Sequence, residues 1–262
     1  MSLGQFGPSP ALSLEVLGGI PARTVIAQAR ELGYPAIGIS AVRSEFSPAA
    51  LGVSGARDLA VYLARNNLAV CWVSAGPRGR FSVSQALDED IARARAVVEL
   101  AGRLRAGAAC VRVGAIGARD SEAAANLGQA LRELAAAADG VGVSLALLPS
   151  PGEGHLIEGV LSGLVDAPVG RMIDPGAALF AGMDPVDEVA LAGKVTAVRA
   201  SDSSAESADL APGEGRVPWR DFLAALGVAD YHGYVTVEFA GRTDAPGRAA
   251  KALSMLRAYT IS

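Results

Sequence analysis

The chain has 262 residues, of which 51% are hydrophobic and 19% charged, with 23 Lys and Arg against 27 Asp and Glu. A chain of this length buries roughly three quarters of its unfolded surface, so it can form a large core. The net charge of −4 provides no positive field for phosphate backbones, and the apolar runs are far shorter than the ~20 residues that cross a bilayer. We therefore expect neither nucleic acid nor a membrane as a partner. The N-terminal sequence has no basic region followed by an apolar one, which predicts a cytoplasmic protein.

Strand-like and helical segments alternate along the whole chain. Continuous apolar runs, typical of strands covered on both faces, lie at 12–17, 35–40, 68–74, 108–114, 143–148, 169–174, 195–201 and 234–240. Helical patterns lie at 21–32, 55–66, 84–106, 121–139, 156–165, 184–192, 218–227 and 245–258. Eight βα units in about 250 residues predict an α/β fold, a single (β/α)8 TIM barrel domain over residues 1–262. A doubly wound open sheet is the alternative.

Polar residues at the carboxyl ends of the strands are the candidates for function, because active sites of such barrels form there. They are Arg43, Ser74, Arg112, His155, Asp174, Arg199, Asp202 and Glu238, with Glu15 as a weaker candidate. The sequence does not determine whether Arg112 faces the barrel interior or the helices. Cys71 and Cys110 lie inside apolar runs and are predicted to be buried core thiols. His232 precedes a strand, so we expect it on the opposite face of the barrel, at the surface.

Four segments carry a resemblance to a known family. "MIDPGAALFAGMDPVDEV", "VTAVRASD", "APGEGRVPWRDFLAAL" and "GYVTVEFAG" follow one another in the order and spacing of the sugar phosphate isomerase/epimerase family, and most of the chain resembles these xylose isomerase-like barrels. The Gly-Glu-Gly turn around Glu214 is the most specific part. The two histidines are too few for the trinuclear zinc site of the apurinic endonucleases that share this fold.

The resemblance implies a divalent metal held by a Glu after the fifth strand, an Asp after the sixth, a His on the seventh and a Glu on the eighth. Asp174 and Glu238 match two of these positions, but Leu148 and Arg199 stand at the other two. Ala177 stands where relatives frequently have a further His. A guanidinium stays protonated and cannot ligate a metal. We therefore expect no cofactor, and Mn²⁺ or Mg²⁺ only if Asp174 and Glu238 suffice as protein ligands.

Arg199 is predicted to place a fixed positive charge between Asp174 and Glu238, where relatives hold a cation. An arginine there would keep both carboxylates ionised. The same three residues would also suit a salt-bridge network without catalytic function. Both interpretations remain open at this stage.

The resemblance implies proton transfer between adjacent carbons of a sugar. We predict Glu238, Asp174 and Arg199 as the catalytic residues, although the resemblance implies a His rather than an Arg on the seventh strand. One acid/base, Glu238, with Arg199 stabilising the oxyanion, fits isomerisation better than a two-base epimerisation. The alternative is a non-catalytic sugar-binding or regulatory barrel. We expect a small sugar or sugar acid as the ligand, with or without a phosphate, and the resemblance suggests a homodimer. The predicted substrate-binding residues are Arg43, Trp72, Arg112, His155, Asp202 and Glu214. Each of them could equally be an ordinary core or surface residue.

Overall fold

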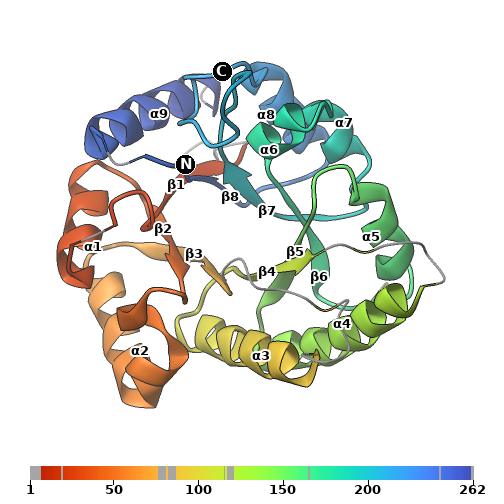
Figure 1. Ribbon diagram of the computed structural model, residues 1–262. Coiled ribbons are helices and arrows are strands. Elements are labelled where there is room, and N and C mark those ends of the chain that lie inside the picture. Colours follow the sequence, from red (N-terminus) through yellow and green to blue (C-terminus); the bar gives the residue numbers. More distant parts are fainter. Residues whose placement is uncertain are drawn as a thin grey trace, which may run out of the picture.

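The computed structural model describes residues 7–18, 20–75, 81, 87–114, 116, 121–164, 166–241 and 243–260. Its strands form a closed parallel barrel in chain order, with the last strand paired to the first (Figure 1). The strands are β1 (Ser9–Ser13), β2 (Ala36–Ser40), β3 (Ala69–Ser74), β4 (Ala108–Gly114), β5 (Ser144–Pro149), β6 (Val169–Ile173), β7 (Val195–Ala200) and β8 (Tyr234–Val237). The predicted TIM barrel is confirmed, and an open doubly wound sheet is excluded.

Helices surround the barrel as an outer ring (Figure 1). They are α1 (Ala22–Glu31), α2 (Pro48–Arg65), α3 (Leu87–Arg103), α4 (Glu122–Val141), α5 (Gly154–Leu161), α6 (Pro175–Phe180), α7 (Pro185–Ala190), α8 (Trp219–Val228) and α9 (Ala245–Thr260), with a 3-10 turn, η1 (Ser44–Phe46), before α2. None of the helices in the described part of the chain has the length and hydropathy that a membrane span requires.

Several helices begin at a residue whose side chain accepts a hydrogen bond from the first turn. Ser47 caps α2, Ser121 caps α4 and Asp184 caps α7. Each of these side chains satisfies a backbone N–H that has no partner inside its helix. Gly142 ends α4 in the left-handed conformation, with φ of 71°, which a residue without Cβ adopts at no steric cost.

Several boundaries differ from the prediction, and the following differences bear on the site or on the fold. β1 ends at Ser13, because residues 14–17, although apolar, form a turn. α2 begins before the predicted 55–66 and is interrupted at Gly52, whose φ of 55° breaks the helical periodicity. The helix expected at 184–192 is α7, and a further short helix, α6, precedes it without having been predicted. β8 ends at Val237, so Glu238 follows the strand rather than lying on it. Residues 84–86 of the predicted third helix lie outside the described residues.

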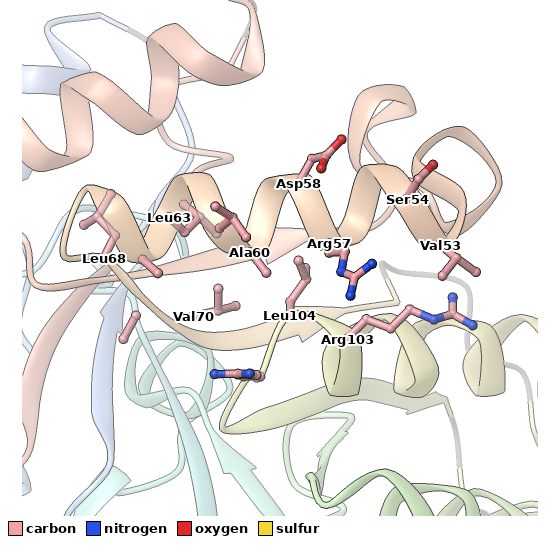
Figure 2. Close-up of a pocket in the computed structure, with 14 residues that line it drawn as sticks. Val53, Ser54, Arg57, Asp58, Ala60, Leu63, Leu68, Val70, Arg103 and Leu104 are labelled. Carbon is pink, nitrogen blue, oxygen red and sulfur yellow. The ribbon is translucent and has the colours of Figure 1, made fainter.

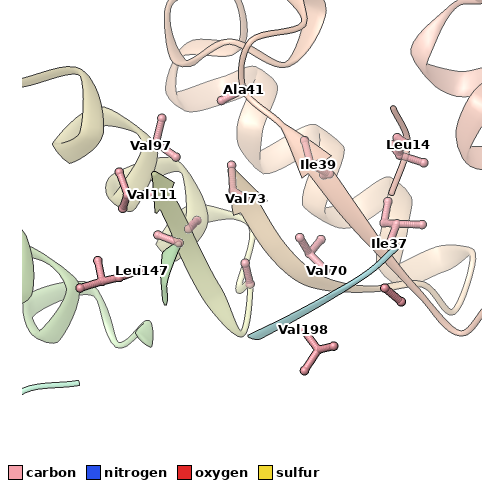
Figure 3. Packing of buried hydrophobic residues seen from close by; sticks show 14 of the residues in the cluster. Leu14, Ile37, Ile39, Ala41, Val70, Val73, Val97, Val111, Leu147 and Val198 are labelled. Atoms are coloured by element: carbon pink, nitrogen blue, oxygen red, sulfur yellow. The ribbon is translucent and has the colours of Figure 1, made fainter. Parts of the chain in front are cut away.

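The main core lies between the strands and the helices. Ile37 and Ile39 of β2 alternate with residues that face the barrel interior, which places both on the helix side of the sheet. Figure 3 shows Val97 of α3 beside Val111 of β4 in this layer. Aliphatic side chains that are removed from water in this way supply the main driving force for closing the barrel.

Inside the barrel, small side chains leave room for two large ones, Trp72 and Met172. The small ones are Ala11, Ala36, Cys71, Ala108, Cys110, Ala146 and Ala197. Trp72 is 2% exposed and lies against Gly38, where a Cβ would come within 2.4 Å of its indole nitrogen. The predicted core position of both cysteines is confirmed, since both are buried free thiols. The barrel is therefore filled at this level, and open space begins above Trp72.

Candidate active site at the barrel mouth

Two adjoining cavities open at the carboxyl ends of the strands. One has a volume of about 240 Å³ and is bordered by Glu15, Ser74 and Glu238, among others. The other, of about 170 Å³, is bordered by Asp174 and Asp209. The side chains that border both are Arg112, Leu148, Met172 and Arg199. These shared residues join the two cavities into one candidate site, at the end of the barrel where such folds place their chemistry.

Arg199 lies at the centre of this site and pairs with three carboxylates. Its Nε donates to Glu238 Oε1 at 2.7 Å, Nη1 to Asp174 Oδ2 at 2.5 Å and Nη2 to Asp209 Oδ1 at 2.7 Å. The predicted position of Arg199 between Asp174 and Glu238 is confirmed, and Asp209 is a third acid that the sequence analysis did not find. Each nitrogen serves one acid, so the guanidinium occupies the space between them.

The acids also determine the charge state of Arg199. Burial by itself lowers the pKa of Arg199, but the negative charges of Asp174, Glu238 and Asp209 outweigh this effect and raise the pKa well above its ordinary value. The guanidinium therefore remains cationic at every accessible pH. Three acidic side chains thus contact one arginine, so the acids outnumber the cation within the cluster.

Asp174 has structural partners on both of its carboxylate oxygens. Besides the ion pair of Oδ2 with Arg199, Oδ1 accepts from the backbone N–H of Ala177 at 3.1 Å and from Ser201 Oγ at 2.5 Å. The first of these bonds caps α6. Asp174 thus holds Arg199, Ser201 and the start of α6 in place, and it also borders the smaller cavity.

Glu238 retains an oxygen for a ligand. Its Oε1 is paired with Arg199, whereas Oε2 accepts no hydrogen bond from any residue that the structure describes. The side chain is partly exposed and borders the larger of the two cavities. Of the predicted catalytic acids, Glu238 is therefore the one with a carboxylate oxygen that has no partner among the described residues.

Arg112 faces the barrel mouth, which answers the question that the sequence left open. It is exposed and borders both cavities, while its neighbours Val111 and Val113 are buried. Within the described ranges it forms no hydrogen bond or ion pair. Its guanidinium is therefore available to a ligand, unlike that of Arg199.

Two predicted substrate contacts lie away from the cavities. Arg43 donates to the carbonyl oxygens of Leu14 and Ile20 and pairs with Glu45 at 2.6 Å, so it holds the loop after β1 against η1. His155 is exposed on α5 and borders neither cavity. The structure thus does not bring either residue into the candidate site.

Asp202 organises the loop between β7 and α8 instead of facing a substrate. It is fully buried, and Oδ1 accepts from the N–H groups of Ser203 and Val217 at 2.8 and 2.9 Å. Oδ2 accepts from the N–H of Gly213 and from Trp219 Nε1, both at 2.9 Å. All of its acceptor capacity is used within the protein, which corrects the predicted binding role.

Glu214 and Trp72 are also engaged with the protein itself. Glu214 accepts two hydrogen bonds from Arg248 of α9, at 2.8 and 2.6 Å, and Arg248 also lies over the ring of Phe239 at 4.3 Å. The Gly-Glu-Gly turn is thereby fixed to α9 and does not close over the pocket. Trp72 borders the larger cavity, but it is buried and forms its floor.

A buried ion pair that the sequence did not predict lies beside the smaller cavity. Arg171 of β6 is almost fully buried and donates to Glu188 of α7 through Nη2 and to the Glu188 carbonyl through Nη1. An arginine inside the run 169–174 was the only signal for this pair. It connects α7 to the barrel wall and leaves Arg171 committed to Glu188.

A groove of about 1000 Å³ lies elsewhere, between α2 and α3 (Figure 2). Leu63, Leu68 and Leu104 form part of it, and Arg57 faces Arg103 across it. It reaches β3 near the start of that strand, at the opposite end from the barrel mouth. Active sites of TIM barrels do not form at that end, so we place the candidate site at the mouth despite the smaller volumes there.

Comparisons with known proteins agree with the fold. The xylose isomerase-like TIM barrel family matches residues 26–259. A xylose isomerase domain protein from Planctomyces limnophilus superposes with a TM-score of 0.81 at 16% identity, over 97% of this chain and 96% of that one. A D-tagatose 3-epimerase-like protein gives 0.78 at 18% identity over 96% of both chains. A 3-keto-D-glucoside 4-epimerase from E. coli gives 0.76 at 15% identity, over 96% of this chain and 99% of that one. No curated protein matches the sequence.

Proposed function

Because the chain belongs to the xylose isomerase-like TIM barrel family, we propose that it is a sugar isomerase or epimerase-like enzyme that transfers a proton on a small carbohydrate. Solved structures with the same fold include a D-psicose 3-epimerase described in the presence of D-fructose and a 3-keto-D-glucoside 4-epimerase. The observation that carries the proposal is the open carboxylate oxygen of Glu238 beside the cationic Arg199, at the edge of the same cavity.

In this mechanism Glu238 is the acid/base. Its Oε2 removes a proton from the carbon next to a sugar carbonyl, and this proton exchanges in part with solvent while Glu238 holds it. Glu238 then delivers a proton to the carbonyl carbon, while the hydroxyl proton of the first carbon passes to the former carbonyl oxygen, so that the carbonyl moves by one carbon. The negative charge that develops on the substrate oxygens faces Arg199, whose terminal nitrogens each carry a second N–H beyond the one given to an acid. Leu148 borders the cavity at the position where the resemblance implies a second acid, which favours a one-base isomerisation.

The proposed reaction uses no divalent metal between Asp174 and Glu238. The residues present do not fit such an ion, since a guanidinium with no lone pair fills the space and Leu148 offers only hydrocarbon. Among the residues that the structure describes, no group of three or more His, Cys, Asp or Glu side chains is arranged to hold a metal. In this proposal Arg199 supplies the positive charge that a divalent ion would otherwise supply there.

The test measures the incorporation of solvent deuterium into aldoses and ketoses by mass spectrometry. The protein is incubated with each sugar in D2O, with and without EDTA. We expect exchange by the wild-type protein and none by Glu238→Gln, while Glu133→Gln, an exposed acid of α4, exchanges normally. Binding without exchange for every sugar would contradict the enzyme proposal and favour the sugar-binding alternative. Exchange that disappears in EDTA would contradict the metal-free mechanism.

A further inference from the structure

We infer that the ligand of this site carries a single carboxylate, as a sugar acid does, and that Arg112 binds it. The inference deepens the proposed function and rests on it for the sugar part of the ligand. Its basis is the difference between Arg112 and the other arginines at this end of the barrel.

Those other arginines are committed to partners within the protein. Arg199 pairs with three acids, Arg171 is almost fully buried against Glu188, and Arg43 is bound to Glu45 and two carbonyl groups. Among the described residues that border the two cavities, Arg112 is the one cation without a partner. A site with one available guanidinium is complementary to one negative group.

The surroundings of Arg112 strengthen a charged contact. Its neighbour across the sheet is Leu148, and Met172 borders the same two cavities. Neither side chain carries an acid that would compete for the guanidinium, so an incoming anion has Arg112 to itself. The planar donor fork of arginine matches the two oxygens of a carboxylate.

The neighbouring acids select against a more highly charged ligand. Asp174, Asp209 and Glu238 outnumber the one cation between them, so a phosphate dianion close to Arg112 would face uncompensated negative charge. A carboxylate monoanion is neutralised by Arg112 alone. We therefore infer a sugar acid rather than a sugar phosphate.

The topology places Arg112 and Glu238 on opposite sides of the barrel mouth. Arg112 lies on β4 and Glu238 follows β8, and these strands are on opposite sides of the closed barrel. Both residues nevertheless border the same cavity of about 240 Å³. A sugar acid anchored at Arg112 would thus extend across the mouth and present its other end to Glu238.

Isothermal titration calorimetry with matched ligands tests the inference. The probes are glucose, galactose and mannose, the uronic acid of each, and the 6-phosphate of each. We expect at least one uronate to bind about ten-fold or more tightly than its hexose and its phosphate, the size of one charge-assisted contact. Arg112→Met should abolish this preference and Arg112→Lys should retain part of it, whereas Arg95→Met, an exposed arginine of α3, should leave it unchanged.

The outcomes separate this inference from the proposed function. No uronate preference, a preference for phosphates, or a uronate preference that survives in Arg112→Met would overturn the inference, even if deuterium exchange into neutral sugars supports the isomerase. Conversely, Arg112-dependent uronate binding without any exchange would support the inference and contradict the catalytic proposal. Failure of every sugar in the panel to bind would count against the carboxylate inference.

Discussion

Replacement of Arg199 by methionine removes the cation but keeps much of the side-chain volume. The three partners differ in exposure, since the side chains of Asp174, Glu238 and Asp209 are 4%, 24% and 45% exposed. Removing one partner of a buried ion pair costs about 3–5 kcal/mol, whereas an exposed pair contributes at most about 1 kcal/mol. Since only Asp174 is well buried, we expect Arg199→Met to lower the free energy of unfolding by about 3 kcal/mol.

For a protein of this size, 1 kcal/mol corresponds to about 2–4 °C in Tm, so the expected decrease is about 6–12 °C. Differential scanning calorimetry measures it, with Arg95→Met as the control, because Arg95 forms only an exposed pair with Glu99 at 3.7 Å. A decrease no larger than that of the control would refute the reasoning, since the three acids would then not depend on Arg199.

The variant Arg199→His tests whether the guanidinium stands in place of a metal ion. An imidazole supplies a nitrogen donor beside three carboxylates that have lost their cation. We expect Mn²⁺ to stabilise this variant by about 2.7 kcal/mol at a hundredfold excess over Kd, and to leave the wild-type protein unchanged. Equal stabilisation of both proteins would show that the wild-type acids already accept a divalent ion and that Arg199 does not replace it.

Three further predictions concern the scaffold. A Cβ at Gly215 would lie 2.3 Å from the carbonyl oxygen of Ser203, so Gly215→Ala should lower the free energy of unfolding in urea by more than about 1 kcal/mol. Gly227 has free space around it, so Gly227→Ala should not destabilise the protein, and equal effects of the two substitutions would contradict the steric cause. Burial raises the pKa of Glu158, so its ionised form is disfavoured in the folded state. The stability that comes from protonated Glu158 is lost as pH rises through the pKa of the folded state. The Tm of Glu158→Gln should therefore exceed that of the wild type at neutral pH and match it below about pH 4. A difference in Tm that does not depend on pH would show that the ionisation of Glu158 is not its cause. Burial also raises the pKa of both cysteine thiols, so iodoacetamide at pH 8 should label neither until urea unfolds the chain, and labelling of the folded protein would contradict their core position.

The barrel could be predicted because its strands are covered on both faces and therefore appear in the sequence as continuous apolar runs. The run 108–114 coincides with β4. β1 was displaced because Leu14 and Leu17 are apolar and buried, although they lie in a turn at the end of the barrel. Hydrophobicity alone does not distinguish a buried strand from a buried turn. α6 was not predicted, because six residues are too few to show a helical period.

The pairing of Asp174, Arg199 and Glu238 was predictable for a topological reason. They lie at the carboxyl ends of β6, β7 and β8, which are neighbours in the barrel, so the fold alone brings them together. Asp209 was not predictable in this way, because it reaches Arg199 only through the path of the loop between β7 and α8. That path depends on the hydrogen bonds that Asp202 accepts from Gly213 and Val217. The spacing of these residues in the sequence does not predict these bonds.

The clearest difference between sequence and structure concerns two arginines that look alike in the sequence. Arg112 and Arg199 both lie within apolar strands and both reach the barrel mouth. Arg199 forms ion pairs with three acids, and its charge holds these acids together. Arg112 has no such partner among the described residues, so its charge is directed at whatever enters the cavity. The number of acids that the fold brings to each arginine therefore separates the one that builds the site from the one that can select its ligand.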